Sequence, residues 1–192
     1  MKPLKFMIYI VLLFSFLGVS HLYAEDLALV TAARKQVGVT KYYDPAYTKV
    51  AYPNGDVALS KGVCTDVVIR AFRDAHQLDL QVRIHKDMQK NFNLYPKKWG
   101  LKRPDKNIDH RRVPNLQVYF KRYWQSLSAS QNITDYDVGD VVTVILPGNL
   151  PHIMLVSDVS NKDAPLVIHN IGLGTREEAS LFSYPITGHY RY

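Results

Sequence analysis

The single cysteine of this chain, Cys64, lies where the sequence predicts the first turn of a helix. Gly62 supplies a turn before it, and the apolar residues after it are spaced as one helical face: Val68, Ala71, Phe72 and Ala75. Unpaired backbone N–H groups and the dipole at a helix start can lower a thiol pKa from about 8.5 towards roughly 3.5–7.5. Cys64 is therefore a candidate nucleophile, although a lone thiol on an apolar stripe is also typical of a small core residue.

Two histidines, His152 and His169, could supply the base that a cysteine nucleophile needs. Each belongs to a β-rich run, and the polar residues 160–163 lie midway between them. If the hairpin turns between Ser160 and Asn161, the two histidines lie directly opposite each other, with Cβ atoms about 4.5–5.5 Å apart. A slip of one residue would send them to opposite faces of the sheet. A thiol, an imidazole base and a second imidazole that orients the base are the parts of an acyl-transfer site.

Three charged residues have alternative readings. Arg111 and Arg112 could grip a substrate carboxylate through paired hydrogen bonds, or they could pair with Asp109 and neighbouring acids to hold a loop. Asp66 lies four residues before Arg70, a spacing that predicts a surface ion pair more often than a catalytic role.

Five histidines could in principle assemble a zinc site: His85, His110, His152, His169 and His189. The sequence has no His-Glu-x-x-His helix and no Cys-x-x-Cys pair, which are the usual zinc-binding patterns. We therefore expect no metal and no other cofactor, with a zinc hydrolase as the least favoured alternative.

The residues that could do chemistry must be positioned by helices in the first half of the chain. A stripe of Leu27, Val30, Ala33 and Val37 predicts a helix over 26–38 that stops at a glycine. Residues 42–60 read as irregular with a possible hairpin, residues 78–92 as partly helical and residues 95–100 as a loop. A further helix is expected to begin near Pro114 and to pack through one face: Leu116, Tyr119, Phe120, Tyr123 and Leu127.

The second half reads as an antiparallel meander. Short β-rich runs are separated by turn residues: Val141–Leu146, Ile153–Val159, Leu166–Ile171 and Tyr184–Tyr192. Thr175 and Glu178 have the spacing of a capping box, which predicts a short helix there. We therefore expect an α+β fold in which helices pack on an antiparallel sheet and the cysteine stands at a helix N-terminus.

The first 24 residues read as a signal peptide. Lys2 and Lys5 precede an apolar run from Phe6 to Val19, and Ala24 suits a cleavage site. An uncleaved membrane anchor is the alternative, and without it no stable membrane insertion is expected. Residues 25–192 are then a single domain, periplasmic or secreted, because 192 residues with 47% hydrophobic content are too few for two comfortable domains.

The mature chain is expected to be moderately basic. Removing residues 1–24 takes away two lysines and no acid, so the formal net charge falls from +7 to +5. An exported basic domain favours an acidic polymer or an anionic surface as its partner, rather than nucleic acid.

The order of these segments resembles the NlpC-type branch of papain-like cysteine peptidases, which cut peptide bonds in the bacterial cell wall. The segments that carry this resemblance are Ala33–Tyr43, Gly62–Asp66, Gly139–Asp140, Pro151–Val156 and Val167–Asn170. Three more resemble, more narrowly, the secreted bacterial family of domains of unknown function numbered 1287: Tyr52–Asp56, Asp109–Asn115 and Thr187–Tyr190. Together the likeness spans Asp26–Tyr192.

The resemblance implies a papain-like fold with Cys64 as nucleophile, His152 as base and His169 as the residue that orients the base. It also implies that Tyr42 or Tyr43 helps to form the oxyanion site. The branch usually has Asp-Cys-Ser-Gly around its nucleophile, whereas this chain has Val-Cys-Thr-Asp, so the substrate cannot be carried over.

The function expected from the sequence is an exported cysteine hydrolase that cleaves a peptide or amide bond in peptidoglycan peptides through a thioester. The alternatives are an amidase or acyltransferase on the same fold, and a non-catalytic wall-binding protein in which Cys64 is only packed.

Overall fold

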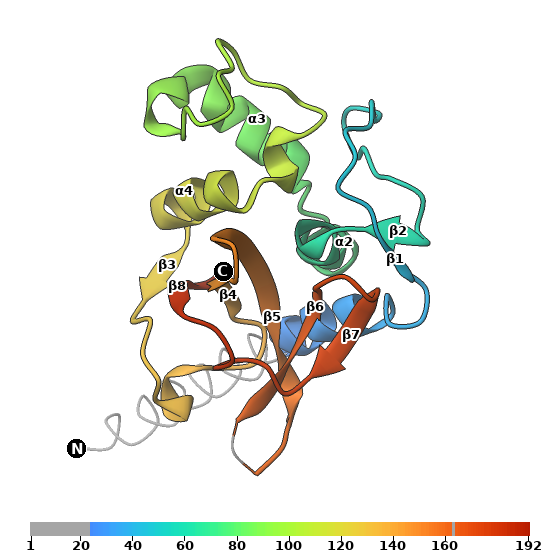
Figure 1. Cartoon of the computed structure of the whole chain (residues 1–192), viewed down its shortest axis with the longest axis vertical. Coiled ribbons are helices and arrows are strands. Elements are labelled where there is room, and N and C mark those ends of the chain that lie inside the picture. Colours follow the sequence, from blue (N-terminus) through green and yellow to red (C-terminus); the bar gives the residue numbers. More distant parts are fainter. Residues whose placement is uncertain (1–23, 163) are drawn as a thin grey trace, which may run out of the picture.

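The computed structural model describes residues 24–162 and 164–192 of the chain. The predicted signal segment, residues 1–24, lies outside the described residues except for Ala24. Helices α2, α3 and α4 gather on one side of a six-stranded antiparallel sheet (Figure 1). The α+β class with helices on an antiparallel sheet is therefore confirmed.

Four α-helices are described: 24–34, α2 (Cys64–His76), α3 (Leu80–Asn91) and α4 (Val113–Tyr123). Three short 3₁₀ turns accompany them: η1 (Phe92–Leu94), η2 (Asp109–Arg111) and η3 (Ile133–Asp135). Helix α2 begins at Cys64 as expected. Its start is fixed by Asp66, whose carboxylate accepts a hydrogen bond of 2.7 Å from the backbone N–H of Val63.

The strands form two sheets. β1 (Tyr42–Tyr43) and β2 (Lys61–Gly62) pair in parallel just before α2. The main sheet has the order β3-β8-β4-β5-β6-β7, and its strands are β3 (Gln125–Leu127), β4 (Val141–Leu146), β5 (Leu150–Ser160), β6 (Pro165–Asn170), β7 (Thr175–Glu178) and β8 (Ile186–Arg191). Strands β4, β5, β6 and β8 are the four expected strands, but β8 pairs with β3 and β4 rather than following β6 in the sheet, and β7 takes the place beside β6.

The sheet separates two apolar clusters. Ile153 and Leu155 of β5 belong to the larger cluster with the helices, and Met154 and Val156 belong to a smaller cluster that includes Leu181. This alternation is what a strand produces when both of its faces are covered. Helix α2 packs on β5 and β6, so the cysteine-bearing helix and the histidine-bearing strands are neighbours.

Two expectations about helices are wrong. Residues Thr175–Glu178 form strand β7 rather than a capped helix, because they pair with β6 and the backbone N–H of Thr175 donates to the carbonyl oxygen of Thr40. The first helix ends at residue 34, so a turn over 35–39 leaves Val37 exposed instead of buried.

Two more differences arise from pairing between distant segments. Leu127 lies in β3, since α4 ends at Tyr123 and the chain then pairs with β8. Residues 44–60 contain no hairpin, because the strand before them pairs with β2 instead. Within residues 24–162 and 164–192, every helix is too short or too polar to cross a bilayer.

Candidate active site

Cys64 occupies the first turn of α2, with only 4% of the residue exposed. Burial raises the pKa of the thiol to about 12, although the backbone N–H groups of Ile153, Thr65 and Cys64 itself hydrogen-bond the sulfur and oppose this rise. The lowered pKa expected at a helix start is therefore not found, because desolvation outweighs the helix terminus. The thiol is protonated at neutral pH in this state.

His152 and His169 form a buried pair. Their residues are 2% and 1% exposed, and Nε2 of His152 lies 2.7 Å from Nδ1 of His169, a hydrogen-bond distance. The ring planes meet at 71°, with centroids 5.0 Å apart. The contact expected between the two imidazoles is present.

The register that creates this contact differs from the expected one. Leu155 pairs with Ile168, and continuing this ladder puts His169 opposite Met154 rather than opposite His152. The hairpin has a register irregularity after Val156 and turns between Asn161 and Ala164, later than expected. Because the shift is two residues, both histidines stay on one face and meet diagonally.

Strand β7 adds a residue that the sequence did not reveal as part of the site. Glu178 accepts a hydrogen bond of 3.0 Å from Nε2 of His169, and Ser180 Oγ lies 3.3 Å from the same nitrogen. The segment reads as a helix cap in the sequence, and only its pairing with β6 brings Glu178 to His169. The result is a row of three side chains, His152, His169 and Glu178.

Burial controls the charge of both histidines. Burial, with a smaller contribution from the neighbouring His169, lowers the pKa of His152 to about 3. Burial also lowers the pKa of His169, although the carboxylate of Glu178 acts in the opposite direction. Both rings are neutral at physiological pH.

Cys64 and His152 are neighbours through the backbone. The sulfur is hydrogen-bonded by the N–H of Ile153, the residue directly after His152. No hydrogen bond between the described atoms joins the sulfur to the imidazole itself. In apo sites, catalytic hydrogen bonds are often long and tighten when substrate binds.

Cys64 lines an open cavity of about 400 Å³. The cavity is otherwise walled by aromatic, proline, apolar and basic residues: Tyr43, Pro45, Tyr47, Val63, Lys98, Trp99, Ile108, Arg111, Arg112, Val113, Pro114 and Pro151. No acidic side chain of the described chain is among them.

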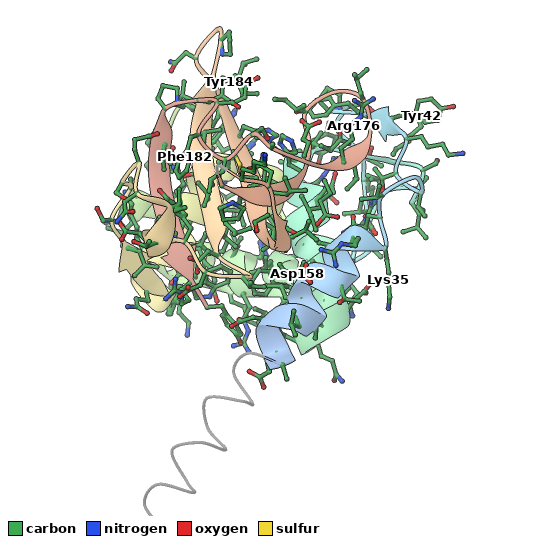
Figure 2. The ribbon with its side chains drawn as sticks, turned by 90° about the horizontal axis from the view of Figure 1, so that it is seen from below. Lys35, Tyr42, Asp158, Arg176, Phe182 and Tyr184 are labelled. Carbon is green, nitrogen blue, oxygen red and sulfur yellow. The ribbon has the colours of Figure 1, made fainter. Side chains whose placement is uncertain are left out.

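The structure distinguishes between the two tyrosines. Tyr43 lines the cavity, and its hydroxyl pKa is raised to about 12 by burial and by the charges of Cys64 and Asp66. Tyr42 is 62% exposed and lies at the outer edge of the molecule (Figure 2). Tyr43 is therefore the tyrosine beside the cysteine.

Asp66 and Arg111 form a buried ion pair at the wall of the cavity, which Arg111 lines. The two oxygens of Asp66 accept hydrogen bonds of 2.9 and 2.8 Å from Nε and Nη2 of Arg111. The expected surface pair between Asp66 and Arg70 is wrong, because both residues are buried and Arg70 binds Asp56 instead. Arg111 thus holds η2 against the start of α2.

Arg112 is also paired. It donates to Asp109 at 3.0 Å, and its guanidinium lies 4.2 Å from the ring centre of Trp99. The ammonium group of Lys98 lies 4.9 Å from the same ring centre and is exposed. Of the three cavity cations, Lys98 is the one with no carboxylate partner among the described residues, and the sequence did not single it out.

Two of the other histidines, His85 and His189, do not line this cavity. His110 is buried in η2, next to Arg111. His189 is bound to Asp140 at 2.6 Å, and His85 stacks edge-on against Tyr52. Within the described residues, no three side chains of His, Cys, Asp or Glu are grouped as metal ligands.

Comparison with known proteins places the chain in a sequence family. The family described as Domain of unknown function (DUF1287) matches residues 30–192. The chain is 54% identical over 168 residues to a protein of Escherichia coli (strain K12) named Uncharacterized protein YijF. That alignment covers 87% of this chain and 82% of the relative. Neither name states a reaction or a substrate.

Proposed function

Because the chain belongs to the DUF1287 family of domains of unknown function, its chemistry has to be argued from the site, and we propose a cysteine hydrolase of the papain-like, NlpC type. The observation that carries the proposal is Cys64 at a helix start and on the wall of a cavity. Its sulfur is hydrogen-bonded by the backbone N–H of Ile153, which follows His152 of the buried histidine pair. A packed structural cysteine needs neither the cavity nor the imidazoles.

The proposed reaction begins from a neutral thiol and a neutral imidazole. His152 takes the thiol proton as the sulfur of Cys64 attacks the carbonyl carbon of a peptide or amide bond. The oxyanion that forms lies within reach of the backbone N–H of Cys64 and of the Tyr43 hydroxyl. His152 then gives its proton to the leaving amine, so the carbon–nitrogen bond breaks and a thioester remains.

Water completes the cycle. His152 takes a proton from a water molecule as the water oxygen attacks the thioester, and the proton returns to the sulfur when the carboxylic acid leaves. An amidase follows the same steps on a different amide. An acyltransferase differs only in that an acceptor amine replaces water.

The proposed substrate is a peptide of the bacterial cell wall, met after export to the periplasm or beyond. The cavity supports an anionic peptide, since, within the described part of the chain, Lys98 has no carboxylate partner and no acidic side chain lines the cavity. Trp99 and Tyr47 offer apolar surface beside that charge.

Two observations favour a second candidate, a non-catalytic wall-binding protein. The thiol pKa of about 12 and the missing hydrogen bond to His152 are what a merely packed cysteine would show. In this case the cavity would bind wall peptides without cutting them.

The test is digestion of purified muropeptides by wild-type protein and by Cys64→Ala and His152→Ala, with the products identified by mass. We expect wild type to release a fragment whose mass names the bond, and both variants to lose at least about a hundredfold in rate. The matched control is His85→Ala, which removes an imidazole outside the cavity and is expected to keep the activity.

Thermal melting shows whether each variant is folded. Equal product from wild type and Cys64→Ala would overturn the hydrolase. Binding of muropeptides without any product would establish the second candidate.

A further inference from the structure

Glu178 ends the row of side chains that starts at His152. It lies on β7, where Val167 of β6 is its cross-strand partner, so it reaches His169 diagonally on the same face of the sheet. Glu177, its neighbour, binds Arg34 on the first helix instead. Two adjacent carboxylates of one strand thus have different partners, and only Glu178 contacts the imidazole pair.

The hydrogen bonds fix the position of each proton. A carboxylate can only accept, so Nε2 of His169 must donate to Glu178 across 3.0 Å. A neutral imidazole carries a single N–H, so Nδ1 of His169 is left as an acceptor. Across the 2.7 Å contact, His152 must then donate from its own Nε2.

We propose that Glu178 is a positioning residue that sets the tautomers of both histidines and so leaves a lone pair on Nδ1 of His152. This nitrogen is the one that can accept the proton of Cys64. The inference rests on the proposed function for its catalytic meaning, but the proton positions themselves follow from the row of hydrogen bonds.

The alternative arrangement shows why a carboxylate is needed. Ser180 Oγ, 3.3 Å from the same nitrogen, can donate as well as accept, so it does not select a tautomer. If His169 were protonated at Nδ1, it would donate to His152, and the single proton of His152 would sit on Nδ1. His152 could then not act as a base towards the thiol.

The test is nitrogen-15 NMR of the full chain at about pH 7, where protonated and unprotonated ring nitrogens of a histidine give separate resonances. We expect the wild type to carry its protons at Nε2 of both His152 and His169. In Glu178→Gln, whose amide can donate or accept, the tautomer protonated at Nδ1 should gain population at both rings. Glu178→Asp should keep the wild-type pattern in part.

The matched control is Glu177→Gln, which removes the same charge from the same strand and should leave both tautomers unchanged. With a working substrate, Glu178→Gln should lower kcat by about tenfold or more with KM little changed, because the base is lost and binding is not. Wild-type protons at Nδ1 of His169, or identical tautomers in wild type and Glu178→Gln, would overturn the inference.

The two proposals fail separately. If the wild type is inactive but shows the expected tautomers, the hydrolase proposal is overturned and the role of Glu178 in placing the protons is kept. If the wild type is active but Glu178→Gln keeps the wild-type tautomers, the hydrolase proposal is kept and the role of Glu178 is overturned.

Discussion

At the scale of single residues, the thiol of Cys64 and the imidazole of His152 are both uncharged at neutral pH before substrate binds. The thiol of Cys64 has its pKa raised to about 12 and the imidazole of His152 has its pKa lowered to about 3, both mainly by burial. A preformed thiolate–imidazolium pair is therefore disfavoured. The proton must move during attack, when substrate brings the sulfur and the ring together.

This predicts the reactivity of Cys64 towards a small alkylating agent. The thiolate is the reactive form, so a raised pKa means that the rate should climb steadily between about pH 6 and about pH 9.5, with no plateau. The measurement is the rate of iodoacetamide incorporation by intact mass. A rate that levels off near neutral pH would show a lowered pKa and an ion pair already formed.

Some site residues can be predicted from the sequence and others cannot. Cys64 and the two histidines could be found because residue type and spacing carry their signal. The sequence does not distinguish Tyr43 from Tyr42, because the choice depends on which side of β1 faces the cavity. Lys98 cannot be found in this way because a lysine in a loop carries no spacing signal. Only the folded cavity shows that Lys98 has no carboxylate partner among the described residues.

At the scale of elements, the site depends on segments that hold the start of α2. Asp66 on α2 receives Arg111 from η2, and Thr65 donates its hydroxyl hydrogen to the carbonyl oxygen of Arg111 at 3.1 Å. Asn170 at the end of β6 donates to the carbonyl oxygen of Gly62 at 3.0 Å. The cysteine is thus fixed from two sides.

Breaking the buried pair should be costly. Arg111→Met leaves the Asp66 carboxylate buried without its cation, and a loss of about 3–5 kcal/mol in the free energy of unfolding is expected. Lys61→Met removes the exposed partner of Asp44 and should change the free energy of unfolding much less, because water screens an exposed ion pair. Urea unfolding measures both variants, and equal losses would show that the Asp66–Arg111 pair contributes nothing special.

Elements also explain what pattern reading could and could not give. Apolar periodicity and turn residues are local signals, so they predict strand β4 to its end residues and place Cys64 in the first turn of α2. β7 was mistaken for a helix, because a strand of four polar residues is defined by its partner β6 rather than by its own sequence. For the same reason, the sequence does not identify Glu178 as a site residue.

At the scale of the whole molecule, two of the segments that carry the family resemblance, 139–140 and 187–190, hold the sheet together. Asp140, the residue before β4, accepts hydrogen bonds from His189 and Arg191 of β8. The ring of His189 stacks on that of Tyr136, with centroids 4.2 Å apart. Nδ1 of His189 also lies 3.1 Å from the carbonyl oxygen of Ser128. The segments 139–140 and 187–190 therefore hold the start of β4, strand β8 and the chain before β4 together. Neither segment lines the cavity of Cys64.

The buried histidines should make the whole fold sensitive to acid. Burial lowers the pKa of His110 to about 4 and of His152 to about 3, and it also lowers the pKa of His169. An unfolded histidine titrates near 6.5, so below that pH the unfolded chain binds protons that the folded protein cannot take. Stability is therefore present above about pH 6.5 and is lost as the pH falls towards the folded pKa values.

The free energy of unfolding should fall by at least about 2 kcal/mol between about pH 6.5 and about pH 4.5. Urea titrations at several pH values, followed by circular dichroism, measure this loss. A constant free energy over the same range would mean that these rings are protonated in the folded protein.

The central claim, that the sulfur of Cys64 attacks the substrate carbonyl carbon and forms a thioester, can be tested on the intact protein. Wild type is mixed with purified muropeptides, quenched in acid within the first turnovers, digested, and examined by mass spectrometry. The account predicts an acyl group on the peptide that contains Cys64, with the mass of the released acid less one water, and no such adduct in His152→Ala. Product formed at the wild-type rate by Cys64→Ala would contradict it.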